Sequence, residues 1–225
     1  MTRPTGPRIA PFMDAIAHDH QLRRLLKAHL AERTTGDDLV VDEFQLAFGA
    51  VRADVALVNG HLEGFEIKAG RDTLARLPNQ VAAYNKVFEY SSVVTTAAHL
   101  AEVRRMVPKE WGLMVAFANS TECGLRPVRT AKRNAGRDGH HLARLLWRDE
   151  LLSKLDDLGA SKGLKSKPKI ALYAALAEAL PVQDLANYVR ACLKSRPDWR
   201  VDAAPREYGD SSHLVAIAQH CPALP

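Results

Sequence analysis

The segment VDEFQLAFGAVRADVALVNGHLEGFEIK, residues 41–68, alternates apolar and polar side chains with a period of two. Because successive side chains of a β-strand point to opposite faces, this alternation predicts three short consecutive strands. Gly49-Ala50 and Asn59-Gly60 have the composition of the tight turns that join such strands. The segment therefore predicts a small sheet that carries its charged side chains on one face.

The first turn sets the pairing of the first two strands. A two-residue loop at Gly49-Ala50 pairs Gln45 with Asp54 and places Glu43 on the same face as both. The same register sends four side chains to the opposite face: Phe44, Leu46, Ala53 and Val55.

The second turn decides whether Asp54 and Glu66 meet. A two-residue loop at Asn59-Gly60 would put these acids on opposite faces and would split the apolar surface of the sheet. A one-residue slip reverses every side chain of a strand, so the apolar pattern favours a three-residue loop over residues 59–61. With that loop Asp54 lies opposite Glu66.

The rest of the chain reads as helices and further strands. We expect helices at 11–32, 72–90, 99–107, 138–158, 170–180 and 182–193, and strands at 92–96, 111–117 and 125–130. Pro78 indicates that the second helix either begins there or kinks. The order predicts an α/β fold with a mixed central β-sheet flanked by helices, followed by a C-terminal helical appendage.

The converging charges suit metal-assisted phosphodiester hydrolysis. Mg²⁺ prefers hard oxygen ligands and keeps several waters, so Asp54, Glu66 and the backbone carbonyl of Ile67 would suffice to bind it. Lys68 would stand beside the metal, where it orients the attacking water or neutralises the transition state. Glu43 would be an extra carboxylate. The alternative is that these charges only cover a half-solvated strand.

A family resemblance strengthens the catalytic interpretation. Asp54 followed by Glu66-Ile67-Lys68 on the next strand resembles the PD-(D/E)XK nuclease superfamily. The downstream helix, with Gln80 and Tyr84 in the sequence QVAAY, is similar to the Q-x-x-x-Y motif of the RecB-type branch. Small bacterial proteins of unknown role share the sequence segments VDEF, RADVA and EIKAGRDTLARLPNQVAAYNKVF. Ala53 stands where many members of the superfamily have Pro.

The resemblance covers residues 15–130 and implies a restriction-endonuclease-like core over residues 1–136. It implies Mg²⁺ as cofactor, with Mn²⁺ as a substitute, and it assigns the metal and catalytic roles to Asp54, Glu66 and Lys68. Gln80 and Tyr84 would line the site.

Three residues before the second helix are further candidates. Arg71 and Arg76 would bind nucleic acid, and Asp72 would also face the cleft. The alternative for these side chains is capping and surface charge.

Residues 137–225 form the predicted helical C-terminal region. Within it, residues 150–181 are similar to the helix-extension-helix of SAP-type DNA-binding modules. That resemblance implies contacts to the phosphate backbone from four lysines: Lys162, Lys165, Lys167 and Lys169. A small helical packing appendage is the alternative.

Charge indicates the partner. The net charge of +5 is uneven: residues 126–169 hold 12 Lys or Arg against 5 Asp or Glu, a local +7 that leaves −2 for the remainder. A basic segment on a near-neutral body indicates nucleic acid, most simply DNA. Duplex cleavage by one site per chain suggests a homodimer.

Other features concern location. Cys123, Cys192 and Cys221 are too few and too widely spaced for a disulfide framework, and no apolar run has the length of a membrane span. Without a signal-peptide pattern at the N-terminus, we expect a cytoplasmic protein with no membrane partner.

We therefore expect a nuclease that hydrolyses phosphodiester bonds in DNA through a Mg²⁺-bound water, acting in DNA repair, phage biology or defence. The alternative is a catalytically silent nucleic-acid-binding or adaptor protein with the same fold.

Overall fold

The computed structural model describes residues 18–46, 49–119 and 122–196. Six strands lie in these ranges: β1 (Leu39–Leu46), β2 (Val51–Val58), β3 (Leu62–Lys68), β4 (Tyr90–Thr95), β5 (Gly112–Ala118) and β6 (Cys123–Arg129). Seven helices lie there as well: α1 (Asp19–Ala31), α2 (Leu77–Val87), α3 (Ala97–Met106), α4 (Gly139–Ala143), α5 (Arg148–Asp157), α6 (Lys169–Ala179) and α7 (Val182–Ser195).

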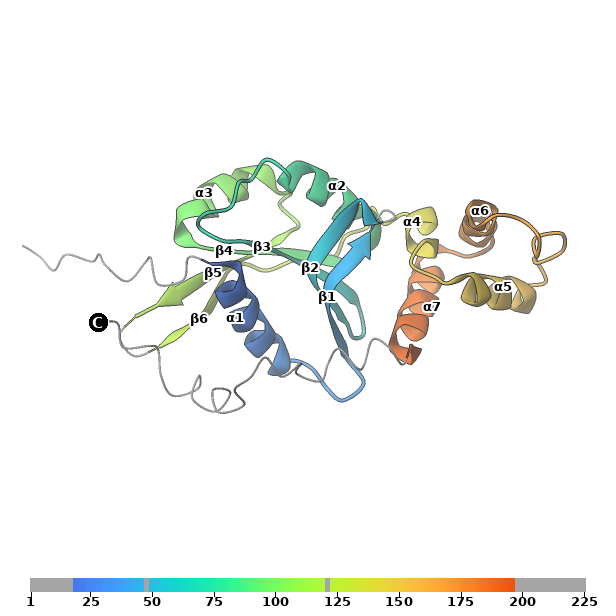
Figure 1. Cartoon of the computed structure of the whole chain (residues 1–225), viewed down its shortest axis with the longest axis horizontal. Coiled ribbons are helices and arrows are strands. Elements are labelled where there is room, and N and C mark those ends of the chain that lie inside the picture. The colour runs from blue at the N-terminus through green and yellow to red at the C-terminus, as the bar shows by residue number, and fades with distance from the viewer. Residues whose placement is uncertain (1–17, 47–48, 120–121, 197–225) are drawn as a thin grey trace, which may run out of the picture.

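The strands form one six-stranded sheet in sequence order, from β1 to β6. The first three strands are antiparallel, β3, β4 and β5 are parallel, and β6 is antiparallel to β5. Helices α2 and α3 cover one face and α1 the other, while α4 to α7 lie beyond the β1–β2 side (Figure 1). The predicted α/β class, with a mixed sheet flanked by helices and a helical C-terminal part, is confirmed.

The predicted register of the second hairpin is confirmed. Val58 pairs with Leu62, so three residues connect the strands, and the pairing continues to Val55 with Phe65. The side-chain oxygen of Asn59 accepts a hydrogen bond from the His61 backbone N–H at 2.7 Å and closes the turn. The same register extended by one pair sets Asp54 opposite Glu66.

The predicted register of the first hairpin is wrong by two residues. Leu46 pairs with Val51 and Gln45 with Arg52, so four residues connect β1 to β2 rather than two. Gly49 lies in this connection with a positive φ of 83°, which favours glycine. The alternation of apolar side chains determines only which face each residue takes, and a shift by two residues leaves the faces unchanged. Phe48, predicted as a strand residue, lies outside the described residues.

The two faces of the sheet have separate cores. On the α1 side, Leu22, Leu26 and Leu30 pack against side chains from the middle of the sheet, including Val55. On the other side lies a larger cluster that includes Phe44, Leu46 and Ala53. These three residues were predicted to share a face with Val55, and that prediction is wrong for Val55. The alternation is broken between Ala53 and Val55, next to Glu43 of β1, whose backbone has a positive φ of 52°. Helix α2 contacts both strands and α7 contacts β2.

Helix α2 begins at Leu77 and has Pro78 in its first turn. This is the first of the two predicted alternatives, a helix start rather than a kink. The helix is shorter than the predicted range 72–90.

The C-terminal end of α2 lies close to the sheet. A Cβ added to Gly64 on β3 would come within 2.4 Å of the Phe88 ring, so only glycine permits this approach.

The helix predicted over residues 138–158 is two helices, α4 and α5. The Glu150 side chain accepts a hydrogen bond from the Trp147 backbone N–H at 2.6 Å. This hydrogen bond caps the N-terminus of α5 and marks it as a separate helix. The C-terminal helices share the larger core cluster with α2 and the sheet, so apolar contacts cross the predicted boundary at 136–137. The two-domain division stays a prediction. In the described part of the chain, no helix is both long and apolar enough to cross a membrane.

Candidate active site

Neighbouring strands β2 and β3 bring Asp54 and Glu66 together. The Ile67 backbone N–H donates a 2.7 Å hydrogen bond to Oδ2 of Asp54, which ties this side chain to the strand that carries Glu66. The side chain of Asp54 is 22% exposed, whereas Glu66 is 1% exposed. One carboxylate is therefore partly accessible to solvent and the other is buried.

Three side chains hold Glu66. Lys68 Nζ and Gln80 Nε2 both donate to its Oε1 at 2.5 Å, and the Tyr84 hydroxyl donates to its Oε2 at 2.7 Å. Gln80 and Tyr84 are one turn apart on α2, so the helix presents both to the same carboxylate. Burial, together with the charge of Glu66, raises the pKa of Tyr84 well above its ordinary value, so the phenol remains a hydrogen-bond donor.

Lys68 is the second buried charge of the site. It is 4% exposed and lies two residues after Glu66, on the same face of β3. Its backbone carbonyl accepts a 2.8 Å hydrogen bond from Thr95 Oγ1 on β4, which fixes the end of β3. A buried ion pair with this number of additional hydrogen bonds has a defined geometry.

The pKa of Asp54 is raised to about 7 by burial first and by the negative charge of Glu66 second. The Ile67 N–H, Arg23 and Lys68 oppose this shift without cancelling it. Burial and the neighbouring charge of Glu66 thus disfavour the charged form of Asp54. An additional cation would stabilise it.

The residues present fit a magnesium ion. Within the described ranges, no three His, Cys, Asp or Glu side chains gather closely enough to hold a metal by themselves. Mg²⁺ can be bound through one or two carboxylates with waters completing its shell, so Asp54 and Glu66 suffice. Gln80 Oε1 is buried beside this pair without a hydrogen-bond partner and supplies another acceptor.

Two other predicted metal ligands, Glu43 and Ile67, make different contacts from those of Asp54 and Glu66. The carboxylate of Glu43 is 47% exposed and binds Arg23 and Arg52 rather than approaching Glu66. For Ile67, the contact that the structure shows with Asp54 comes from its N–H.

The residues predicted before α2 lie in an exposed segment. Arg71, Asp72 and Arg76 are all exposed. Asp72 accepts a 2.8 Å hydrogen bond from the Ala69 backbone N–H, so its local role is to close the turn after β3.

Three of the predicted nucleic-acid-binding lysines, Lys162, Lys165 and Lys167, lie on the connection between α5 and α6, and Lys169 is the first residue of α6. All four are exposed. Arg148 holds this connection through hydrogen bonds to the carbonyls of Lys165 and Lys167 at 2.6 and 3.0 Å. Their ammonium groups are therefore presented on an ordered backbone.

Two charged groups have roles that the sequence pattern did not reveal. Arg23 reaches from α1 to Asp54 and Glu43. Glu89, 1% exposed, binds three guanidinium groups from beyond residue 130: those of Arg133, Arg137 and Arg190. Helical periodicity placed Arg23 on a helix but gave no sign of its partners, and the three arginines that bind Glu89 lie 44 to 101 positions after it in sequence.

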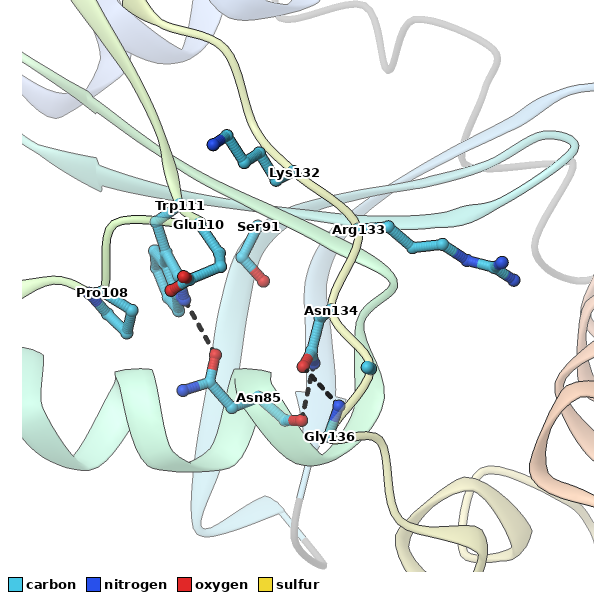
Figure 2. Close-up of a pocket in the computed structure, with 10 residues that line it drawn as sticks. Asn85, Ser91, Pro108, Glu110, Trp111, Lys132, Arg133, Asn134 and Gly136 are labelled. Atoms are coloured by element: carbon cyan, nitrogen blue, oxygen red, sulfur yellow. Dashed lines mark hydrogen bonds between the residues drawn. The ribbon is translucent and has the colours of Figure 1, made fainter.

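A cavity of about 350 Å³ lies at the other end of α2 (Figure 2). Its wall includes Asn85 and Trp111, joined by a 2.8 Å hydrogen bond from the indole N–H. The cavity does not contain the carboxylate pair, but the Trp111 ring lies 5.2 Å from the ring of Tyr84. We place the site at Asp54 and Glu66 because the titratable and hydrogen-bonding groups converge there.

The fold and the site define a mixed α/β protein with one partly exposed and one buried carboxylate, a lysine and a supporting glutamine and tyrosine. The chain belongs to the family of bacteriophage P4 protein cII, which matches residues 17–203. It is 26% identical over 163 residues to protein cII of Enterobacteria phage P4, a match that covers 71% of this chain. The chain spans about 60% of the length of that relative.

A solved protein of unknown function from Silicibacter pomeroyi is 20% identical. The match covers 65% of this chain and 92% of the other, with a TM-score of 0.41. Family membership relates the chain to a bacteriophage protein. The fold class itself follows from the strand order and registers of this chain.

Proposed function

We propose that this protein is a magnesium-dependent nuclease that hydrolyses phosphodiester bonds in DNA. The observation that carries the proposal is the convergence of Asp54, from the middle of β2, with Glu66 and Lys68, from the C-terminal end of β3. The support of Glu66 by Gln80 and Tyr84 adds to it, as does the resemblance of these five positions to PD-(D/E)XK nucleases.

The chain's own residues have distinct parts in this proposal. Asp54 and Glu66 would hold the cation with their carboxylate oxygens. Gln80 and Tyr84 fix the orientation of Glu66, because each donates a hydrogen bond to one of its two oxygens. Lys68 lies beside the pair as a fixed positive charge and stabilises negative charge that develops on the phosphate.

The bound Mg²⁺ would neutralise phosphoryl oxygens and lower the pKa of water. Substrate binding would come from the exposed lysines on the α5–α6 connection and from Arg71 and Arg76. Such contacts go to phosphates and carry no sequence information. Because the matched relative is a bacteriophage protein, we favour phage biology over DNA repair or defence as the setting.

A catalytically silent nucleic-acid-binding or adaptor protein is the second candidate. One observation favours it: both oxygens of Glu66 already accept hydrogen bonds from protein side chains. In a silent protein Lys68 would serve as the permanent counter-ion of Glu66.

The deciding experiment incubates the protein with single-stranded, duplex and branched DNA and with RNA, in Mg²⁺ or in Ca²⁺. The matched control is Glu66→Gln, which keeps the size of the side chain and removes its charge. Cleavage with Mg²⁺ that is absent in the control supports the nuclease. Binding without cleavage of any substrate supports the silent protein, and equal cleavage by the control assigns the activity to a contaminant.

A further inference from the structure

Arg23 on α1 lies against the solvent side of the proposed metal site. Its side chain is 19% exposed, and its guanidinium donates to the backbone carbonyl of Asp54 at 2.5 Å and to Glu43 Oε1 at 3.0 Å. It also lies 3.4 Å from Oδ1 of Asp54. One protein cation thus joins Asp54, the more exposed carboxylate of the pair, to Glu43, the predicted extra carboxylate.

Two further acids surround the same guanidinium. Asp19 Oδ1 lies 3.4 Å from Nε, and Asp42 Oδ1 lies 3.5 Å from NH1. Asp42 also binds Lys27, and Glu43 also binds Arg52 at 3.5 Å. Arg23 is therefore the group on which the four carboxylates converge, and its position is determined by all of them.

Glu43 is held in an unusual backbone conformation. Its φ is +52°, the one positive value among the described non-glycine residues. A left-handed conformation is costly for such a residue, and it persists only where the surroundings determine it. The pairing of β1 with β2 is interrupted here: Asp42 pairs with Val55 and Phe44 with Ala53, but Glu43 has no pairing of its own.

We propose that Arg23 is a positioning residue that competes with the divalent cation for Glu43 and Asp54. This inference rests on the proposed metal site and goes beyond it. While Arg23 holds Glu43, two carboxylates serve the metal. Loss of the guanidinium would leave Glu43 paired with the exposed Arg52 alone, so that its Oε1 becomes available to the cation. It would also remove a positive charge that repels the cation.

The competition follows from charge and geometry. A guanidinium and a Mg²⁺ ion both seek carboxylate oxygens, and they repel each other when placed on the same carboxylate. Asp54 does not depend on Arg23 for its orientation, since its other oxygen accepts the Ile67 N–H at 2.7 Å. Removal of Arg23 therefore leaves the first ligand in place.

The test measures Mn²⁺ affinity of the full chain by calorimetry, without any substrate. Arg23→Gln should bind Mn²⁺ about five to ten times more tightly than the unmodified protein, because one unit of positive charge is lost beside the site. Arg24→Gln is the matched control: it removes the same charge from the neighbouring, exposed position of α1 and should change the affinity less than twofold. Arg23→Lys should restore most of the original affinity.

A double variant identifies the role of Glu43. Glu43→Gln alone should have little effect, whereas Glu43→Gln combined with Arg23→Gln should abolish most of the gain. A folded Arg23→Gln protein, judged by its thermal transition, that binds Mn²⁺ no more tightly than the unmodified protein overturns the competition alone. Absence of Mn²⁺ binding in every variant overturns the metal site and the competition together.

Discussion

The hydroxyl of Tyr84 donates a 2.7 Å hydrogen bond to Oε2 of Glu66, and the Tyr84 ring is completely buried between Phe88 and Trp111. A residue of α2 is thereby both part of the core and a support of the candidate catalytic carboxylate. The coupling has a consequence for stability, since Glu66 is 1% exposed and depends on such donors for its charge.

Tyr84→Phe should retain the ring packing and lose the hydrogen bond to Glu66. We expect the free energy of unfolding to fall by about 1–3 kcal/mol, because a buried charged acceptor loses a donor. Urea denaturation measures this change, with Tyr90→Phe as the control, expected to change stability by less than about 0.5 kcal/mol. An equal effect in both variants would show that the hydroxyl of Tyr84 does not support Glu66.

Lys68→Ala and Glu66→Ala should each lower the rate of DNA cleavage by about a hundredfold or more, because charge stabilisation at the reacting phosphate is lost. DNA affinity, measured by fluorescence anisotropy, should change little, since the binding lysines lie elsewhere. Glu102→Gln on the exposed side of α3 is the control. Unchanged cleavage by Lys68→Ala would remove Lys68 from the mechanism.

Asp54 should make stability depend on pH. Its pKa is raised from 3.8 to about 7, so between these values the native state retains a proton that the unfolded state has lost. Stability therefore falls as pH rises from about 4 to about 7 and reaches its low value above that range. Asp54→Asn should remove this slope and be more stable than the unmodified protein at pH 8, by on the order of 1–3 kcal/mol.

Thermal unfolding of both proteins at pH 5, 6, 7 and 8, without divalent metal, measures the difference. A stability difference that stays constant across this range would contradict the raised pKa of Asp54.

Lys165→Glu combined with Lys167→Glu should weaken DNA binding and flatten its dependence on salt. Each phosphate contact contributes a slope of about 0.9 in a plot of log affinity against log salt concentration, so the loss of two contacts lowers the slope by about 2. Lys109→Glu, at another exposed lysine, is the control. If binding by the double variant is unchanged, the α5–α6 connection serves packing and not DNA.

Glu89→Gln should destabilise the attachment of the C-terminal helices. Glu89 is the buried partner of Arg133 and Arg137 in the segment before α4 and of Arg190 on α7, at 2.9, 3.4 and 3.6 Å. Removal of its charge leaves three guanidinium groups together, for which we expect a loss of about 3–5 kcal/mol.

Chemical denaturation measures the loss at Glu89. Asp156→Asn on the exposed end of α5 is the control and should cost less than about 1 kcal/mol. A loss at Glu89 no larger than that of the control would show that the cluster contributes nothing to the junction.

The sequence by itself determined that Asp54 and Glu66 would meet. Three residues between β2 and β3 place Val55 and Leu57 on the same face as Phe65 and Ile67, and any one-residue slip would separate the two pairs. It also predicted that Gln80 and Tyr84 would share one face of the helix, because residues four apart lie together. For Pro78 it left a helix start and a kink as alternatives, and the structure shows the start.

Tertiary structure decided what periodicity leaves open. Alternation specifies the face of a strand residue but not a shift by two, so the four-residue connection before Val51 could not be predicted. The partners of Arg23 and Glu89 lie on other elements, 19 or more positions away apart from Asp19, and depend on how those elements pack. Long charged side chains reach such partners only once the core is assembled. The ion pairs around Asp54 and Glu89 therefore could not be predicted from the sequence.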